Sequence, residues 1–97
     1  MKYLIDYNLT EKDIQDINES LSEEEWIMLT TSTSKIESIL DYLQSLGITD
    51  FKELFINRRN VLYQNVEKIE KKINECNIPD IIEKLQENIH NFDLLDL

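Results

Sequence analysis

The chain has 97 residues and a mass of 11.6 kDa, the size of one small folded domain. Ten basic and twenty acidic side chains give a net charge of −10, which disfavours nonspecific attraction to nucleic acid or to an anionic membrane. The single cysteine excludes an internal disulfide framework and a cysteine-based zinc cluster, and no run of apolar residues is long enough to predict a membrane-spanning helix.

The scarcity of turn residues predicts an all-α fold in one domain, residues 1–97. Gly47 and Pro79 are the only glycine and proline, and a β-rich fold with many tight turns needs more of both. The N-terminus reaches Asp6 too early for a signal peptide. With no predicted membrane span, we expect a soluble, cytoplasmic protein without a cofactor.

Capping residues mark helix starts in the N-terminal half. Thr10 is expected to cap a short helix. Ser22 and Glu25 form a Ser-x-x-Glu capping box, in which each side chain accepts a hydrogen bond from an amide that the helix leaves free. Ser34 and Glu37 repeat this pattern. The second box is expected to open a helix with one buried stripe, formed by Ile36, Ile39, Leu40 and Leu43.

Further signals divide the C-terminal half. Gly47 stands where a left-handed residue is expected to end the preceding helix. Thr49 and Asn65 are expected to cap the next two helices, and Asn77 to stop the second of these. Pro79 suits the first turn of the last helix, because its missing N–H would have no partner there. That last helix is expected to carry the apolar residues Ile82, Leu85, Ile89 and Phe92.

The tail, residues 93–97, is acidic and apolar. We expect it to dock on the core. The alternatives are a flexible end and a docking peptide for a partner, with Leu94, Leu95 and Leu97 as its apolar contacts.

An internal repeat relates two parts of the chain. The segment from Leu29 to Leu40 matches the segment from Leu62 to Ile73 at an offset of 33 residues. A unit of about 30–35 residues with two helices has the size of an α-helical solenoid repeat. Each such unit has one apolar face that must be covered, so we expect neighbouring units to stack. The alternative is an irregular helical bundle whose helices look alike by chance.

Three stretches resemble a known repeat. Residues 42–54, YLQSLGITDFKEL, resemble the linker and second-helix start of the mitochondrial transcription termination factor (mTERF) repeat, whose pattern runs "fL.slG.s..di..l". Residues 60–69 resemble its "P.lL..s.e.l" segment, with Asn60 in place of the family's proline, and residues 3–14 resemble another copy of the linker. The resemblance implies a small right-handed stack of two to three helix pairs. Family members bind double-stranded nucleic acid through a positively charged concave face, whereas this chain is acidic, so the resemblance supports the fold more than the function.

Acidic residues concentrate near the N-terminus, where residues 1–33 hold two basic and eight acidic side chains. Either this is a solvated helix face, or it is a surface that attracts a basic partner by imitating phosphates. The candidate protein interface comprises Asp13, Asp16, Glu19, Glu23, Glu24, Glu25, Trp26, Leu94, Leu95 and Leu97. Trp26 is expected to pack in the core, and would be the best interface anchor if it were exposed.

One window is locally basic. Its candidate nucleic-acid contacts are Arg58, Arg59, Lys68, Lys71 and Lys72, interrupted by Glu67 and Glu70. The arginine pair falls near a predicted helix end, where cations stabilise exposed carbonyls, so a structural role is the alternative to a phosphate contact.

Recognisable catalytic chemistry is missing from the sequence. His90 is the only histidine, no glycine-rich nucleophile turn or phosphate loop exists, and Cys76 lies on an apolar helix stripe. Acids follow no calcium-loop spacing. We therefore predict that the protein is not an enzyme and binds no metal.

Three functions remain open. The first is a protein-interaction module, an acidic inhibitor or adaptor that binds a basic protein. The second is an mTERF-like nucleic-acid-binding domain. The third is a self-associating structural unit, a homodimer, because one apolar set follows the spacing of a two-heptad seam: Leu62, Val66, Ile69, Ile73 and Cys76.

Overall fold

All regular elements of the described chain are helices, as predicted. The computed structural model describes residues 2–95, and within this range no strand is present. The elements in chain order are the 3₁₀ helix η1 (Lys2–Tyr7), α1 (Glu11–Ser20), α2 (Glu23–Thr31), α3 (Thr33–Ser45), α4 (Phe51–Asn57), the 3₁₀ helix η2 (Arg59–Tyr63), α5 (Val66–Asn74), α6 (Ile78–Glu87) and the 3₁₀ helix η3 (Ile89–Leu95).

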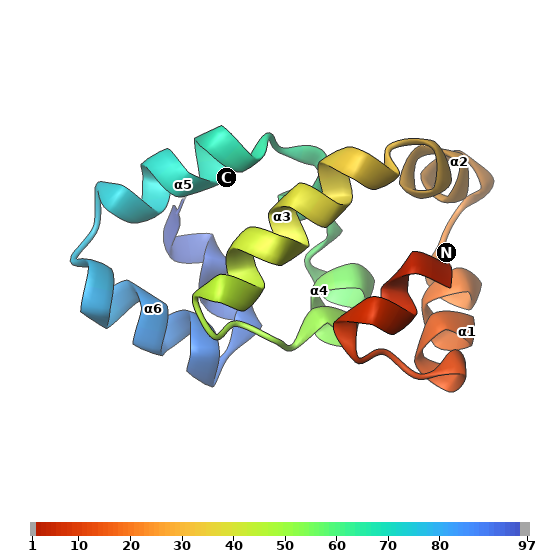
Figure 1. Cartoon of the computed structure of the whole chain (residues 1–97), viewed down its shortest axis with the longest axis horizontal. Helices are drawn as coiled ribbons and strands as arrows, with labels where there is room; N and C mark the ends of the chain where they lie inside the picture. Colours follow the sequence, from red (N-terminus) through yellow and green to blue (C-terminus); the bar gives the residue numbers. More distant parts are fainter. Residues whose placement is uncertain (1, 96–97) are drawn as a thin grey trace.

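The helices succeed one another along the longest dimension of the molecule, which measures 36 × 21 × 20 Å (Figure 1). α1 and α2 lie at one end, α3 and α4 in the middle, and α5 and α6 at the other end. α3 packs on α5, and α1 packs on α4. α3 begins at Thr33 and α5 at Val66, which is the 33-residue offset found in the sequence. Neighbouring helix pairs therefore cover one another's apolar faces.

The core contains the stripes that periodicity indicated. Burying an apolar side chain of this size contributes about 1.5–3 kcal/mol. The middle of the core is formed by fully buried residues from three helices, namely Ile36, Ile39, Leu40, Leu43, Leu54, Phe55, Ile69 and Ile73. Three members of the predicted dimer seam, Leu62, Ile69 and Ile73, are buried inside this single chain. They are therefore covered within the chain and do not form a free seam for a second copy, whereas self-association through another surface stays a prediction.

Two capping boxes close helix starts at the N-terminal end. Thr10 Oγ1 accepts a hydrogen bond from the Asp13 amide, and the Asp13 carboxylate accepts one from the Thr10 amide, 3.1 and 3.0 Å. The Ser22–Glu25 box has the same reciprocal pair, 3.2 and 3.1 Å. These bonds satisfy amides that the first turn leaves free, and the predicted box at Ser22 is confirmed.

The predicted box at Ser34 and Glu37 is wrong. α3 begins at Thr33, and Ser32 is its N-cap without a side-chain hydrogen bond. Ser32 alone separates α2 from α3: its amide donates to Met28 O at 3.0 Å, and its carbonyl accepts from the Ile36 amide at 3.1 Å. Because the backbone of one residue closes both helices, Ser34 lies inside the first turn and caps nothing.

Several later boundaries also shift. The N-cap of α4 is Asp50, not Thr49, while Asn65 occupies the N-cap position of α5 as predicted but makes no side-chain capping hydrogen bond. α5 ends at Asn74, before the predicted stop, and Asn77 instead caps α6 by accepting from the Asp80 amide at 3.4 Å. These are differences of one to three residues, which local propensity rarely resolves.

The last predicted helix breaks in two. α6 ends at Glu87, and Asn88 has extended backbone angles, φ −154° and ψ 118°. Ile89 and Phe92 therefore belong to η3, where both are buried. The break folds η3 back against α6, so a continuous helix over these residues is wrong although their burial was predicted.

Gly47 ends α3 in the left-handed conformation that the sequence predicted, with φ +78°. Its amide donates to Gln44 O and the Ile48 amide donates to Leu43 O, both at 3.0 Å. This pair of bonds is a Schellman motif, and the buried side chains of Leu43 and Ile48 complete it. The sharp turn sets the direction in which α4 leaves α3.

The Gly47→Ala variant should therefore be less stable by about 1–2 kcal/mol. An added Cβ would lie 2.5 Å from Gln86 Nε2, which donates to Leu46 O at 2.8 Å, and the left-handed backbone disfavours any L side chain. Urea denaturation measures the loss. Gln86→Ala is the matched control: if the double variant Gly47→Ala/Gln86→Ala regained full stability, the clash and not the backbone would be the cause.

Candidate protein-interaction surface

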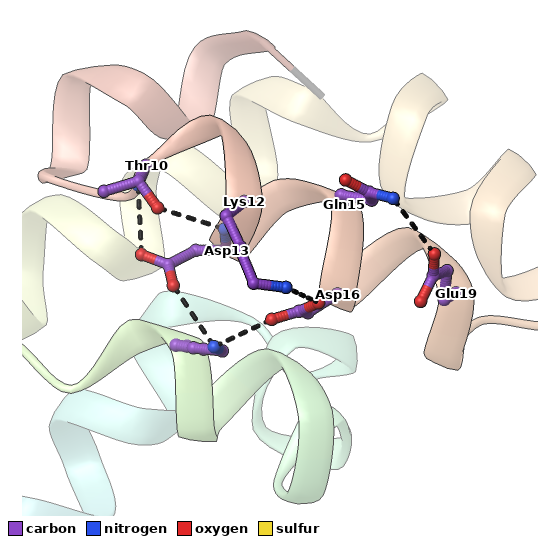
Figure 2. A network of polar contacts seen from close by, with 7 residues as sticks. Thr10, Lys12, Asp13, Gln15, Asp16 and Glu19 are labelled. Carbon is purple, nitrogen blue, oxygen red and sulfur yellow. Dashed lines mark hydrogen bonds and ion pairs between the residues drawn. The ribbon is translucent and has the colours of Figure 1, made fainter.

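Two of the predicted interface acids are used inside the chain. Asp13 and Asp16 of α1 both contact the Lys52 ammonium group of α4, at 3.2 and 3.0 Å (Figure 2). Lys12 adds a second contact to Asp16 at 3.4 Å. Hydrogen bonds from the Thr10 amide, for Asp13, and from Lys52, for Asp16, lower the pKa of each carboxyl group below its ordinary value of 3.8. These carboxylates join α1 to α4.

This network predicts a specific response to pH. A carboxyl group whose pKa is lower in the folded state stabilises the fold above its unfolded pKa, and this contribution is lost as the pH falls through the folded pKa. Stability should therefore decline below about pH 4. In Lys52→Met, the pKa of Asp16 should rise toward 3.8, whereas Asp13 should keep a lowered pKa because the Thr10 amide is its main cause.

NMR titration of the two carboxyl groups, with urea denaturation at several pH values, measures this response. Lys84→Met is the matched control, since within residues 2–95 the ammonium group of Lys84 pairs with Asp80 of the same helix, α6, at 3.0 Å and with no other carboxylate. It should leave both α1 carboxyl groups unchanged. An unchanged Asp16 titration in Lys52→Met would contradict the assigned contact.

Glu25 is also a structural residue. Besides its capping box, its carboxylate contacts Arg59 Nε at 2.8 Å and accepts a hydrogen bond from the Tyr63 hydroxyl at 3.1 Å. The hydrogen bond from the Ser22 amide is the main reason why the pKa of Glu25 is lowered. Arg59 further donates to Ser20 Oγ at 3.0 Å and to Phe55 O at 3.1 Å. This network fixes the turn between α1 and α2 against α4 and η2.

The other acids of the group face solvent. Glu19 accepts a hydrogen bond from Gln15 at 3.2 Å. Glu23 and Glu24 are exposed in the first turn of α2, and no ion pair involves them within residues 2–95. Of the six predicted acids, these two have neither an ion pair nor a side-chain hydrogen bond within residues 2–95, while Glu19 is exposed and bonded only to Gln15 of its own helix.

Trp26 is exposed, so its predicted place in the core is wrong. The exposed fractions of Trp26, Ile27 and Met28 are 47%, 48% and 43%. Successive residues of a helix point about 100° apart, and Leu29 is the one residue of α2 that is fully buried. α2 lies at the end of the molecule, so only one side of it meets other helices (Figure 1). We call Glu23, Glu24, Trp26, Ile27 and Met28 the α2 surface.

Sequence reasoning did not single out Ile27 and Met28. A signal for them exists in the segment EEEWIMLTT, where four apolar residues stand in succession. A run of this kind cannot bury all its members from one side of a helix, because they point around its whole circumference. The missing i, i+3, i+4 spacing could therefore have indicated an exposed apolar surface.

The tail is docked as far as the structure describes it. Leu95 is buried in η3, and Asp93 pairs with Arg58 at 2.9 Å. Leu94 is exposed. The predicted contact Leu97 lies outside the described residues. Of the described apolar tail residues, Leu94 is thus the one that the structure leaves accessible.

The candidate nucleic-acid contacts, like the predicted interface acids, include residues that form ion pairs within the chain. Arg58 and Arg59 make the ion pairs with Asp93 and Glu25 just described. Lys68 donates to Gln64 Oε1 at 3.0 Å. Lys71 and Lys72 lie in the last turn of α5, where cations stabilise the helix C-terminus. Both arginines also donate to carbonyls in the last turn of α4, Arg58 to Asn57 O at 3.4 Å and Arg59 to Phe55 O at 3.1 Å, which is the structural role that the alternative interpretation expected.

The remaining reactive side chains have local partners. His90 Nε2 lies 2.8 Å from Glu53 Oε1. The pKa of Glu53 is lowered, mainly by the hydrogen bond from Asn57 and then by His90. Cys76 is partly buried, and its thiol donates to Lys72 O at 3.4 Å. Within the described chain, no His, Cys, Asp and Glu side chains group as metal ligands, and no helix has the length and apolar character to cross a membrane.

Comparison of the chain with protein-family models, with curated proteins and with solved structures finds no match. The resemblance to the mTERF repeat stays a prediction.

Proposed function

We propose that the protein is a non-catalytic protein-interaction module that binds a protein partner through the α2 surface. The observation that supports this is the solvent exposure of three consecutive large apolar side chains, Trp26, Ile27 and Met28, in a chain that buries most of its other large ones. Clustered exposed apolar residues mark interaction sites, and tryptophan is enriched among residues that dominate binding energies.

The charge favours an acidic inhibitor or adaptor. The net charge of −10 attracts a basic protein over distances of about 10 Å or less at physiological salt, and repels other acidic surfaces. Glu23 and Glu24 border the apolar residues of the α2 surface. The carboxylates that attract a basic partner therefore lie next to the apolar side chains that the partner would contact. Leu94 is too isolated to act as a second anchor of comparable size.

The nucleic-acid alternative has weaker support. With Arg58 and Arg59 paired inside the chain, its contacts reduce to Lys68, Lys71 and Lys72. Three phosphate contacts supply little affinity at physiological salt, and the overall negative charge opposes them. Titration with duplex DNA and RNA at about 50 mM salt tests this alternative, for which we expect no binding at micromolar protein.

Site-specific photo-cross-linking tests the proposed function. A photoreactive amino acid replaces Ile27 in one variant and the exposed Glu87 of α6 in another, and each is irradiated in the protein's native cells. We expect a discrete protein adduct from position 27 and none from position 87. Equal labelling at both positions, or no adduct at position 27, would count against the α2 surface as an interface.

A further inference from the structure

We propose that the α2 surface binds a basic amphipathic helix of the partner. The apolar side chains of that helix pack on Trp26 and Ile27, and its lysine or arginine side chains pair with Glu23 and Glu24. Met28 lies at the edge of this contact, because it points about 160° away from Trp26 around α2. This inference rests on the proposed function and adds the chemistry of the partner segment. It reduces the predicted acidic interface from six carboxylates to the two that have no partner within residues 2–95.

The shape of the surface determines what can bind there. The described chain has no strand, so it offers no sheet edge to which an extended peptide could add. The backbone groups in the middle of α2 are bonded within the helix, which leaves only side chains for recognition. Trp26 and Thr30, four residues apart, form a ridge of the kind that packs into the groove of another helix.

The distribution of charge selects a basic partner over a second copy of this chain. Two copies that met through their α2 surfaces would bring four carboxylates together around the apolar contact. A head-to-tail contact between the α2 surface of one copy and the C-terminal part of another is also repulsive, because residues 66–97 hold four basic and eight acidic side chains. α5 is the most cationic helix, yet Glu67 and Glu70 offset two of its three lysines. A partner helix that carries lysine or arginine beside its apolar stripe meets neither obstacle.

Trp26 provides a direct measurement, because it is the only tryptophan and its fluorescence reports contact at this surface. The probe is a designed peptide with leucine at i, i+3, i+4 and i+7 and lysine at its other positions. Two matched peptides carry glutamine or glutamate in place of lysine. We expect a saturable blue shift with the lysine peptide, a weaker one with the glutamine peptide and none with the glutamate peptide.

Variants locate the charge contribution. Glu23→Gln/Glu24→Gln should weaken binding of the lysine peptide by about two- to thirtyfold, the range for two exposed ion pairs. The control Glu83→Gln/Glu87→Gln removes the same charge from exposed positions of α6 and should change binding less than about twofold. Raising the salt to about 0.5 M should remove most of the difference between the wild-type protein and Glu23→Gln/Glu24→Gln.

The outcomes separate this inference from the proposed function. Equal effects of the two double variants, or equal binding of the lysine and glutamine peptides, would overturn the inference. A protein adduct at position 27 would in that case still support the interaction module. A blue shift that grows with protein concentration in the absence of peptide would identify a second copy as the occupant and would also overturn it.

Discussion

Replacing Phe51 by alanine should lower the free energy of unfolding by about 3–5 kcal/mol, the range for removing a buried aromatic ring. Phe51 is almost completely buried at the start of α4, and its ring packs edge-to-face against Tyr7 of η1, with centroids 5.9 Å apart and planes at 79°. Such a ring pair adds about 0.5–1.5 kcal/mol to the burial of its area. A domain of this size has about 5–15 kcal/mol in total, so much of its stability should be lost.

The Phe51 ring connects two parts of the fold. Tyr7 donates a hydrogen bond to Asp41 of α3 at 2.7 Å, and burial is the main reason why the pKa of Tyr7 is raised. Removing the ring therefore loosens η1 from both α3 and α4. Urea denaturation followed by circular dichroism measures the effect, with Ile27→Ala as the control that should change stability by less than about 0.5 kcal/mol. A loss below about 1 kcal/mol in Phe51→Ala would contradict the described core.

The elements that the sequence predicted well are those fixed by neighbours along the chain. The Ser22–Glu25 box and the Gly47 turn each depend on residues three to five positions apart, so their geometry follows from local rules. The predicted Ser34–Glu37 box spans equally few residues, yet it does not form. α3 already begins at Thr33, so Ser34 is a helical residue of the first turn, whereas a capping side chain has to stand at the residue before the helix.

The roles of the charged residues could not be predicted from such local rules, because their partners are distant in the sequence. Asp16 and Lys52 are 36 residues apart, and the contact between them exists only because α1 packs on α4. Glu25 and Arg59 meet for a similar reason. Sequence reasoning therefore grouped all the N-terminal acids as one surface. The fold separates those that hold helices together from Glu19, Glu23 and Glu24, which face solvent.

The error at Trp26 has a tertiary cause as well. An aromatic residue in a short helix is usually buried, and the capping box next to it gave no reason to expect otherwise. α2, however, lies at the end of the molecule, so it has neighbouring helices on one side only (Figure 1). Burial of Leu29 uses that side, and Trp26, Ile27 and Met28 are left in solvent. The unbroken apolar run of α2 indicates that some of its members are exposed, but which of them are exposed depends on where the neighbouring helices lie.

Replacing Trp26 by alanine should weaken binding of the lysine peptide by about thirtyfold or more, because truncating a dominant interface residue costs about 2 kcal/mol or more. The same change should leave the stability of the fold within about 0.5 kcal/mol of the wild-type value, since roughly half of the side chain is already in water. A core residue would show the opposite pattern, as Phe51→Ala should. The ratio of the two effects therefore distinguishes a binding residue from a packing residue.

Fluorescence anisotropy of a labelled peptide measures this binding, since the variant has lost its only tryptophan. Leu94→Ala is the matched control: Leu94 is also exposed and apolar, but it lies in η3 and outside the α2 surface. It should bind the peptide like the wild-type protein. If Trp26→Ala and Leu94→Ala weakened binding equally, the peptide would be sampling apolar side chains without preference. A Trp26→Ala variant that bound normally but unfolded more easily would place the ring in the core, contrary to the described surface.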